Sequence, residues 1–477
     1  MENLDEAFES LMKDASKAAE KIREKAVKGG FINLISHLDA DGLAAAGILG
    51  KALARLDAYF RIRIRHWVDE KLINEIISEK PDLTIFTDLG SGYLDLISEG
   101  LGEHEIVILD HHQPVGEPSP SHLHVNPHQY GVDGSIALSG AGVAYLTAKA
   151  IDSANQDLAY VAVVGALGDM QDKYGQRSLG GLNEYIVKDA VETGFLEVVE
   201  KEIIFFGRET RPIHKALACT TSPFIPGLSG EEDKCLAFLA SIGIKPKIGD
   251  KWRALRDLTE EEKTKLCSSL AEYLISKGVP KETLNLVGTV YTFVREEPWT
   301  PLRDGREFSV LLNATGRMEK PSLGIAICMG DRSLAFEEAT KILEEYRRLI
   351  TKHLGWLIEN ERIKELDHIY VVQGENDVEE KIIGTIASIL STNMQTDKPI
   401  IAYAIVPEEE IVKVSARTID SLVKKGLDLS EIMREAAEKC EGRGGGHKIA
   451  AGAQIPIKQI ENFIKIVDRL VAKQLGK

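Results

Sequence analysis

The run of residues 31–42, FINLISHLDADG, constrains the fold more than any other part of the sequence. Apolar and β-prone residues lead into His37, Asp39 and Asp41, and an Ala/Leu-rich run follows. This order predicts a strand, an acidic loop and a helix. In an open α/β sheet, ligands bind outside the carboxyl ends of the strands. One imidazole and two carboxylates at that position favour a hard divalent cation such as Mn²⁺ or Mg²⁺.

Two later apolar runs end in the same way. Residues 83–87 (LTIFT) lead into Asp88, and residues 105–109 (EIVIL) lead into the sequence DHH at 110–112. An acidic residue after one strand would mean little, because Asp is common in turns. Carboxylates and imidazoles after three strands predict an α/β domain with a parallel sheet and one polar edge.

An acidic residue also follows the apolar run 159–168, which predicts a buried helix. We place Asp169 in the same cluster because its Gly-Asp step directly follows the run, with Asp172 as the alternative. The small residues SGAG at 139–142 open another predicted helix. Its N–H groups could receive a phosphate, although close helix packing explains the small residues equally well.

The predicted metal ligands are His37, Asp39, Asp41, Asp88, His111 and Asp169. Six ligands are too many for one ion that also holds water, and they suit two ions ~3.5–4 Å apart. Asp88 is the predicted bridge, because its strand should lie between the other two. A bridging hydroxide would then attack phosphorus in line. His112 would stabilise phosphoryl charge or protonate the leaving oxygen, and Asp110 would orient a histidine.

The composition disfavours several classes of protein. A net charge of −16 disfavours a basic nucleic-acid coat protein but not an enzyme with a local basic groove. The sequence contains no run of 18 apolar residues, so we expect no membrane span. The acidic N-terminus lacks the apolar core of a signal peptide. Five scattered cysteines without a CxxC pair fit a reducing compartment. We therefore expect a cytoplasmic protein that does not contact membranes.

The strand and helix pattern changes four times along the chain. After residue 194 the alternation stops, and polar helical runs predict a mainly helical insertion, in which Thr259 and Glu262 fit a capping box. A long helical pattern later precedes a second α/β unit. The expected segments are a catalytic domain (1–194), the insertion (195–297), a return to the first domain (298–333), a bridging helix (334–366) and a smaller α/β domain (367–477).

A glycine-rich segment at 441–452, EGRGGGHKIAAG, marks the second α/β unit. We expect it to form a loop that carries His447 and opens a helix, although three glycines also suit a flexible turn. Ser415 and Arg417 end an earlier strand and could share a pocket with this loop. Backbone N–H groups, an arginine and a histidine together suit a phosphate.

Several motifs in this order resemble one known family. HLDADG, TDLG, DHH and GDMQD resemble the four motifs of the DHH phosphoesterase superfamily, and SARTID with GRGGGHKIAAG resembles its DHHA1 domain. LLNATGR resembles the NAxGR element of RecJ-type nucleases. With the insertion, the whole resembles the archaeal RecJ-like branch, the GINS-associated nuclease.

The resemblance implies a manganese-dependent exonuclease that acts on single-stranded DNA or RNA in replication or repair. Two Mn²⁺ ions, with Mg²⁺ as a possible substitute, would serve the reaction, and the GINS complex of the replisome would be a partner. The strand would thread between the two domains. The residues expected to bind it are Asn313, Arg317, Ser415, Arg417, Gly444, Gly445, Gly446 and His447.

Two other functions stay open. The first is a phosphodiesterase of short oligonucleotides or cyclic dinucleotides, which the insertion and the bridging helix disfavour. The second is a non-catalytic replisome subunit that retains the fold, which the complete ligand set disfavours. A comparison of hydrolysis between long and very short substrates distinguishes the first function from an exonuclease. The metal content of the purified protein distinguishes the second function from an enzyme.

Overall fold

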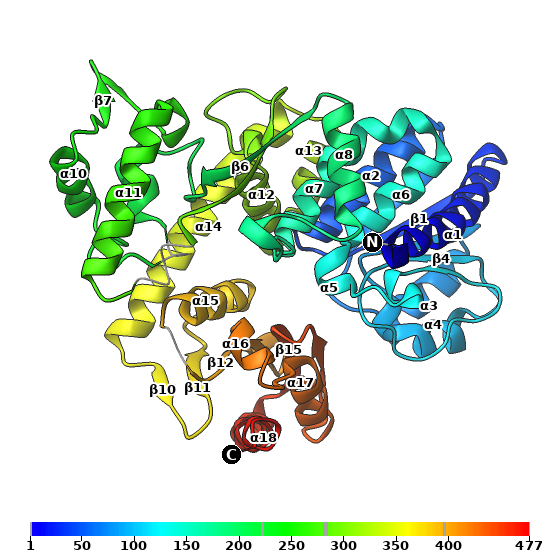
Figure 1. Ribbon diagram of the computed structural model, residues 1–477. Coiled ribbons are helices and arrows are strands. Elements are labelled where there is room, and N and C mark those ends of the chain that lie inside the picture. Colours follow the sequence, from blue (N-terminus) through cyan, green and yellow to red (C-terminus); the bar gives the residue numbers. More distant parts are fainter. Residues whose placement is uncertain (1, 221–223, 280–284, 395–396, 477) are drawn as a thin grey trace. The chain divides into compact units, whose positions relative to one another are not determined.

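The chain divides into two compact units, Met1–Leu343 and Glu344–Lys477. The computed structural model describes residues 2–220, 224–279, 285–394 and 397–476. Each unit is built around one large β-sheet, with smaller strand pairs in the first (Figure 1). Among the described residues, no helix combines the length and apolarity needed to cross a lipid bilayer.

The first unit contains the predicted parallel sheet, in the strand order β2-β1-β3-β4-β5. The strands are β1 (Phe31–Ser36), β2 (Tyr59–Ile64), β3 (Leu83–Thr87), β4 (Ile106–Leu109) and β5 (Leu123–Val125). β3 and β4 are buried along their whole length, as is usual for a parallel sheet covered on both faces. In this strand order β3 lies between β1 and β4, as the sequence predicted.

Helices cover both faces of this sheet. α1, α2 and α6 pack on one face, whereas α3 and α4 pack on the other (Figure 1). The α-helices that lie wholly within this unit, outside the insertion, are α1 (Glu2–Val27), α2 (Ala40–Arg55), α3 (Glu70–Glu79), α4 (Leu94–Leu101), α5 (Gly134–Ala137), α6 (Gly140–Ile151), α7 (Ala159–Gly168), α8 (Asn183–Glu192), α12 (Gly305–Arg317) and α13 (Pro321–Cys328).

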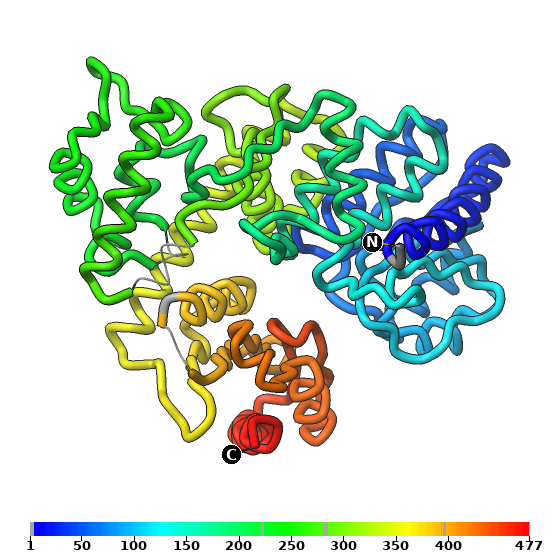
Figure 2. The backbone as a smooth tube through the Cα atoms, in the orientation of Figure 1, coloured from blue at the N-terminus to red at the C-terminus, as the bar shows by residue number. Residues whose placement is uncertain are grey.

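The insertion begins and ends in an antiparallel strand pair, which the sequence did not predict. The chain enters through β6 (Leu196–Ile203) and returns through β9 (Val287–Phe293). Figure 2 shows the insertion in green. Between these two strands, the described residues form a short hairpin and three α-helices. These are α9 (Ile213–Ala218), α10 (Glu232–Ser241), β7 (Lys247–Ile248), β8 (Lys251–Trp252) and α11 (Glu260–Ser276). The capping box of Thr259 and Glu262 at α11 is confirmed.

Glu307, in the first turn of α12, is a buried carboxylate where the insertion meets this helix. Its oxygens accept hydrogen bonds from the N–H of Glu209, at 2.9 Å, and from the hydroxyl of Thr210. Burial, reinforced by the negative charge of Asp304, raises the pKa of Glu307 to about 7. The junction therefore holds a carboxyl group that is protonated more readily than usual.

We expect Glu307→Gln to remove part of the pH dependence of folding stability. The pKa of Glu307 is about 7 in the folded protein against 4.5 for an ordinary glutamate, so the folded state binds more protons between these values. The free energy of unfolding should therefore fall as the pH rises through this window, by up to about 3 kcal/mol from this group. Urea unfolding of both proteins between pH 4.5 and pH 8 measures this. A gap between variant and wild type that is constant with pH would contradict the assignment.

The second unit begins within the long helix α14 (Leu334–Glu359). This helix ends at Glu359, so the prediction of a helix to residue 366 is wrong. Glu361 adopts a left-handed conformation with φ 52°, and the N–H of Arg362 donates to the carbonyl of Leu357. The chain turns there because β10 (Ile363–Glu365) pairs with the next strand.

The sheet of the second unit is mixed, in the strand order β10-β11-β12-β13-β15-β14. Its further strands are β11 (Tyr370–Glu375), β12 (Ile400–Val406), β13 (Ile411–Arg417), β14 (Arg443–Gly446) and β15 (Ala450–Pro456). The helices are α15 (Glu380–Asn393), α16 (Asp420–Val423), α17 (Leu429–Glu438) and α18 (Ile460–Gln474). The core between the sheet and α17 and α18 is apolar.

The glycine-rich segment is a strand, so the prediction of a loop that opens a helix is wrong. β14 pairs with β15, and Gly444, Gly445 and Gly446 each have a partner residue there. The N–H of His447 and the carbonyl of Ala450 close the tight connection at 2.8 Å. A β-carbon on Gly444 would lie 2.3 Å from a carbonyl oxygen of α17, so glycine is needed here for close packing.

Candidate metal centre

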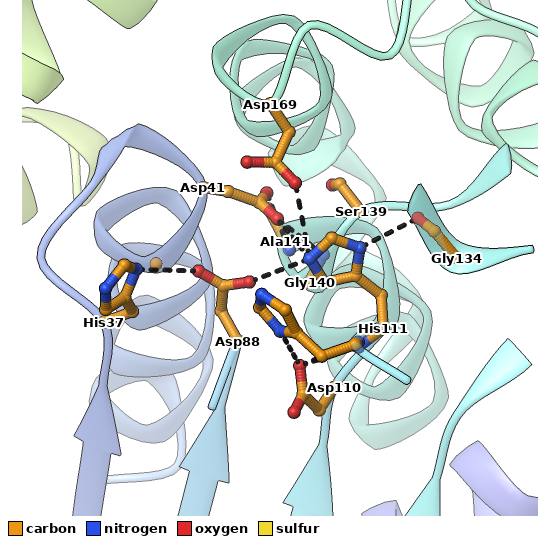
Figure 3. A network of polar contacts seen from close by, with 12 residues as sticks. His37, Asp41, Asp88, Asp110, His111, Gly134, Ser139, Gly140, Ala141 and Asp169 are labelled. Carbon is orange, nitrogen blue, oxygen red and sulfur yellow. Dashed lines mark hydrogen bonds and ion pairs between the residues drawn. The ribbon is translucent and has the colours of Figure 1, made fainter. Parts of the chain in front are cut away.

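The carboxyl ends of β1, β3 and β4 deliver polar side chains to one place (Figure 3). Asp39 caps α2, Asp41 lies in its first turn, and Asp169 caps the carboxyl end of α7. The structure brings together all eight predicted residues of this cluster, which are His37, Asp39, Asp41, Asp88, Asp110, His111, His112 and Asp169. Asp172 instead pairs with Arg306 at 2.8 Å and with Arg177.

Asp88 lies at the centre of the cluster. One of its oxygens is 3.2 Å from Nε2 of His111, and the other is 3.8 Å from Nδ1 of His37. Asp39 lies 3.0 Å from the same nitrogen of His37. On the other side, Asp169 lies 3.3 Å from Nε2 of His111. Two groups of candidate ligands therefore flank one carboxylate, whose two oxygens face in different directions (Figure 3).

The backbone around Asp88 is specialised. Asp88 has a φ of 52°, in the left-handed region that Asp and Asn tolerate better than other side chains. A β-carbon on Gly140 would lie 2.5 Å from an oxygen of Asp88, so only glycine fits where α6 begins. The N–H groups of Gly140 and Ala141 donate to Asp41 at 2.6 and 3.0 Å. This helix start therefore binds a carboxylate of the chain, and its small residues serve close packing.

The cluster concentrates negative charge in a buried place. Burial, together with the charges of Asp41 and Asp39, raises the pKa of Asp88 well above its ordinary value. Burial and Asp41 also raise the pKa of Asp169 to about 8. Neither oxygen of Asp88 accepts a well-formed hydrogen bond within the described part of the chain. Crowded buried carboxylates are satisfied by cations, so the donor set fits divalent metal ions.

The pKa values of the two histidines that flank Asp88, His111 and His37, are raised by the negative charges of the cluster. Burial opposes a rise in the pKa of His111, but the carboxylates of Asp88, Asp169 and Asp41 outweigh it and raise this pKa well above its usual range. Burial likewise opposes the rise for His37, whose pKa the carboxylate of Asp39 raises. Each imidazole therefore faces strong negative potential, as expected of nitrogen ligands beside a cation site.

The carboxylate of Asp110 is hydrogen-bonded to His112. Nδ1 of His112 donates to Asp110 at 2.7 Å, and the N–H groups of Ser91 and His111 also donate to this carboxylate. Burial would raise the pKa of Asp110, but the imidazole of His112 and these donors lower it well below its usual range. The contact of Nδ1 with Asp110 fixes the orientation of the His112 ring. This is the geometry of an orienting carboxylate.

The NAxGR element packs against the acidic loop after β1. The side-chain oxygen of Asn313 accepts a hydrogen bond from the N–H of Ala40 at 3.1 Å. Gly316 faces the carbonyl of Leu38 so closely that a β-carbon would lie 1.7 Å from its oxygen. The guanidinium of Arg317 lies near the cluster: its positive charge opposes the rise in the pKa of His37, and it adds to the lowering of the pKa of Asp39 by His37. Asn313 thus holds the loop, and its role as a substrate ligand stays a prediction.

We expect Gly316→Ala to displace the acidic loop and to destabilise the first unit. The new methyl group would overlap the carbonyl of Leu38, and overpacking of this kind costs ~1–3 kcal/mol. Gly355→Ala is the matched control, because it lies in α14 with nothing within 4 Å of the new atom and should be neutral or stabilising. Thermal unfolding of both variants measures the difference. Equal melting temperatures would contradict the close contact.

The predicted phosphate-binding residues of the second unit lie near one another on its sheet. Ser415 on β13 pairs with Gly452 on β15, which pairs with Gly445 on β14. The two glycines leave the row beside Ser415 free of side chains. Arg417, two residues along β13, donates from Nε to the hydroxyl of Ser388 on α15 at 2.8 Å. This arrangement gives a polar strip that the backbone of a ligand could approach closely.

The chain matches three family models, and the matches agree with this architecture. The model "DHH family, N-terminal domain" matches residues 32–166, the DHH-CID domain matches 205–287 and the DHHA1 domain matches 367–473. A protein of Methanocaldococcus jannaschii that is named as uncharacterized is 35% identical over 474 residues, covering 98% of this chain and 99% of the relative.

Solved structures that resemble the chain include a RecJ and a CDC45. RecJ from Thermus thermophilus in complex with Mn²⁺ has a TM-score of 0.59 and 19% identity, covering 97% of this chain and 55% of that chain. CDC45 from Entamoeba histolytica has a TM-score of 0.65 and 12% identity, covering 97% and 99%. The chain thus spans about half the length of that RecJ and nearly all of that CDC45.

These findings define a class of protein and a place within it. The chain belongs to the DHH family, whose members are phosphoesterases. Within the family it is a RecJ-like member that carries both the DHH-CID and the DHHA1 domains.

Proposed function

We propose that this protein is a manganese-dependent exonuclease that hydrolyses phosphodiester bonds of single-stranded DNA or RNA from one end. The observation that carries the proposal is the position of Asp88, whose two oxygens face His111 and His37 from one buried carboxylate. A carboxylate between two groups of nitrogen and oxygen donors suits a pair of divalent ions. The RecJ structure in complex with Mn²⁺ supports manganese as the ion, and a RecJ structure in complex with Mg²⁺ supports magnesium as a substitute.

The chain's own residues would divide the work as follows. His37 and Asp39 would hold one ion, Asp41, His111 and Asp169 would hold the other, and Asp88 would lie between them. When bound, such ions supply an acidified water and neutralise phosphoryl charge.

His112 would act on the substrate. With its Nδ1 held by Asp110, its Nε2 would stabilise charge on the phosphoryl oxygens or give a proton to the leaving oxygen. The burial of Asp110 and His111 keeps bulk water away from these groups.

The second unit would grip the nucleic-acid strand. Ser415, Arg417 and His447 would contact phosphates, and the glycines of β14 would let the strand approach closely because they carry no side chains. In this proposal, residues 1–194 and 298–333 form the catalytic domain, 195–297 the insertion and 367–477 the substrate-binding domain. The protein would work in the cytoplasm, in replication or repair, with the GINS complex as a partner.

The likeness to CDC45 gives a second candidate function, a non-catalytic replisome subunit. The eight clustered residues at the carboxyl ends of the strands favour an enzyme, because buried like charges cost free energy that a scaffold need not spend. Metal content of the purified protein separates the two.

The deciding experiment is digestion of long single-stranded DNA and RNA with Mn²⁺, each strand labelled at one end or the other. We expect release of mononucleotides from one end. Cleavage restricted to di- to pentanucleotides or cyclic dinucleotides would replace the exonuclease with a small-substrate phosphodiesterase. No hydrolysis with any substrate would leave the replisome subunit as the better account.

A further inference from the structure

Two fully buried amide side chains, Gln171 and Asn183, lie behind His111. Burying an amide costs free energy unless it is hydrogen-bonded, so each of these side chains needs a partner. Neither residue belongs to the predicted ligand set. We propose that Gln171 is a positioning residue for His111 and acts through the carbonyl oxygen of Gly134, with Asn183 holding Gln171 in place.

The hydrogen bonds form one continuous relay. Nδ1 of His111 donates to the carbonyl of Gly134 at 2.8 Å, and Nε2 of Gln171 donates to the same oxygen at 2.9 Å. Asn183, the first residue of α8, donates from its amide to Oε1 of Gln171 at 2.8 Å. Figure 3 shows the first contact, between His111 and Gly134.

The relay fixes which nitrogen of His111 faces the carboxylates. Because Asn183 occupies the oxygen of Gln171, the amide NH₂ of Gln171 must point at Gly134. The carbonyl of Gly134 can only accept, so Nδ1 of His111 carries a proton. Nε2 is then left towards Asp88 and Asp169, where a neutral imidazole presents its lone pair to a cation.

The local backbone joins the relay to the cluster. Asp169 and Gln171 flank Met170, which has a φ of 53° and is half exposed. The N–H of Gln171 donates to the carbonyl of Ala166 at 3.0 Å and so ties this turn to the end of α7. A left-handed residue between them lets Asp169 reach His111 while Gln171 reaches Gly134. This one turn therefore positions both Asp169, a candidate oxygen ligand, and Gln171, which supports the nitrogen ligand His111.

The inference rests on the metal centre proposed above and is independent of which substrate the protein takes. A metal-ligating histidine needs a partner on its other nitrogen, and loss of such outer partners weakens metal binding by ~10- to 100-fold. Gln171→Met keeps the volume of the side chain and removes both hydrogen bonds. Because the carbonyl of Gly134 remains as the direct partner of His111, we expect the dissociation constant for Mn²⁺ to rise by about tenfold, at the lower end of that range. Asn183→Ala, which only loosens Gln171, should give a smaller increase.

The test is titration of the full chain with Mn²⁺ alone, with the free ion followed by electron paramagnetic resonance. Asn155→Ala is the matched control, because Asn155 is also fully buried in the first unit and donates to a backbone carbonyl, that of Ala148, at 2.9 Å. It should melt at a lower temperature without loss of Mn²⁺ affinity. Melting curves without metal show which variants fold. If Gln171→Met does not fold, the Mn²⁺ affinity of Asn183→Ala tests the relay.

The possible outcomes separate this inference from the proposed function. Weaker binding in the order wild type, Asn183→Ala, Gln171→Met, with Asn155→Ala equal to wild type, supports the relay. A wild type that binds Mn²⁺ while Gln171→Met binds it as tightly would overturn the relay and leave the metal centre standing. A wild type that binds no Mn²⁺ would overturn both.

Discussion

Asp88→Asn is expected to abolish Mn²⁺ binding and hydrolysis while raising the melting temperature of the metal-free protein. Asparagine keeps the shape of the side chain and is well tolerated at the left-handed φ of 52°. The substitution therefore changes the charge and leaves the backbone conformation undisturbed. It removes the carboxylate that lies between the two candidate ligand groups.

The direction of the stability change follows from the charges around Asp88. Burial and the neighbouring carboxylates of Asp41 and Asp39 raise the pKa of Asp88 well above its ordinary value, so its ionised form destabilises the fold when no cation is present. The amide carries no such cost. In the wild type, Mn²⁺ should raise the melting temperature because it binds only the folded state, and this rise should vanish in the variant.

The loss of activity should be large. Metal ions at a phosphoryl centre contribute several kcal/mol of charge stabilisation, and about 4 kcal/mol corresponds to roughly 10³ in rate. Asp57→Asn is the matched control, since Asp57 also has a left-handed φ, of 51°, and lies outside the cluster, in the turn after α2. A variant Asp88→Asn that kept the Mn²⁺-dependent rise in melting temperature would show that Asp88 does not hold metal.

The position of this cluster was predictable because it depends on short-range patterns. Each strand is a local apolar run, and in a parallel sheet the residues that follow the strands meet at one edge. The order β1-β3-β4 then placed Asp88 between its neighbours. The cap of α7 at Asp169 followed in the same way from one apolar run and the residue after it.

Features that depend on distant parts of the chain were not predictable. The hydrogen bond from Ala40 to Asn313 spans 273 residues, and β6 pairs with β9 across the whole insertion. In the sequence alone, Gly444 is compatible with a flexible turn. The need for glycine there comes from its close contact with α17, which only the tertiary structure shows. No periodicity points to Gln171 or Asn183 either, because their significance lies in the shared carbonyl of Gly134.

His112→Asn should slow hydrolysis strongly while leaving Mn²⁺ affinity unchanged. An asparagine amide can replace Nδ1 of His112 as the donor to Asp110, a contact of 2.7 Å, but it offers nothing in place of Nε2. General acid catalysis and charge stabilisation by such a group contribute about 10²- to 10⁴-fold, so turnover at saturating Mn²⁺ should fall within that range.

The affinity for Mn²⁺ distinguishes a catalytic histidine from a metal ligand. His112 lies close enough to Asp88, Asp110 and His111 to join a ligand group, so the role of its Nε2 has to be measured. If Nε2 acts on the substrate, His112→Asn loses turnover and keeps the dissociation constant for Mn²⁺. If it binds metal, both change together, as they should for Asp88→Asn. His104→Asn, on the loop before β4, is the control and should match the wild type in both measurements.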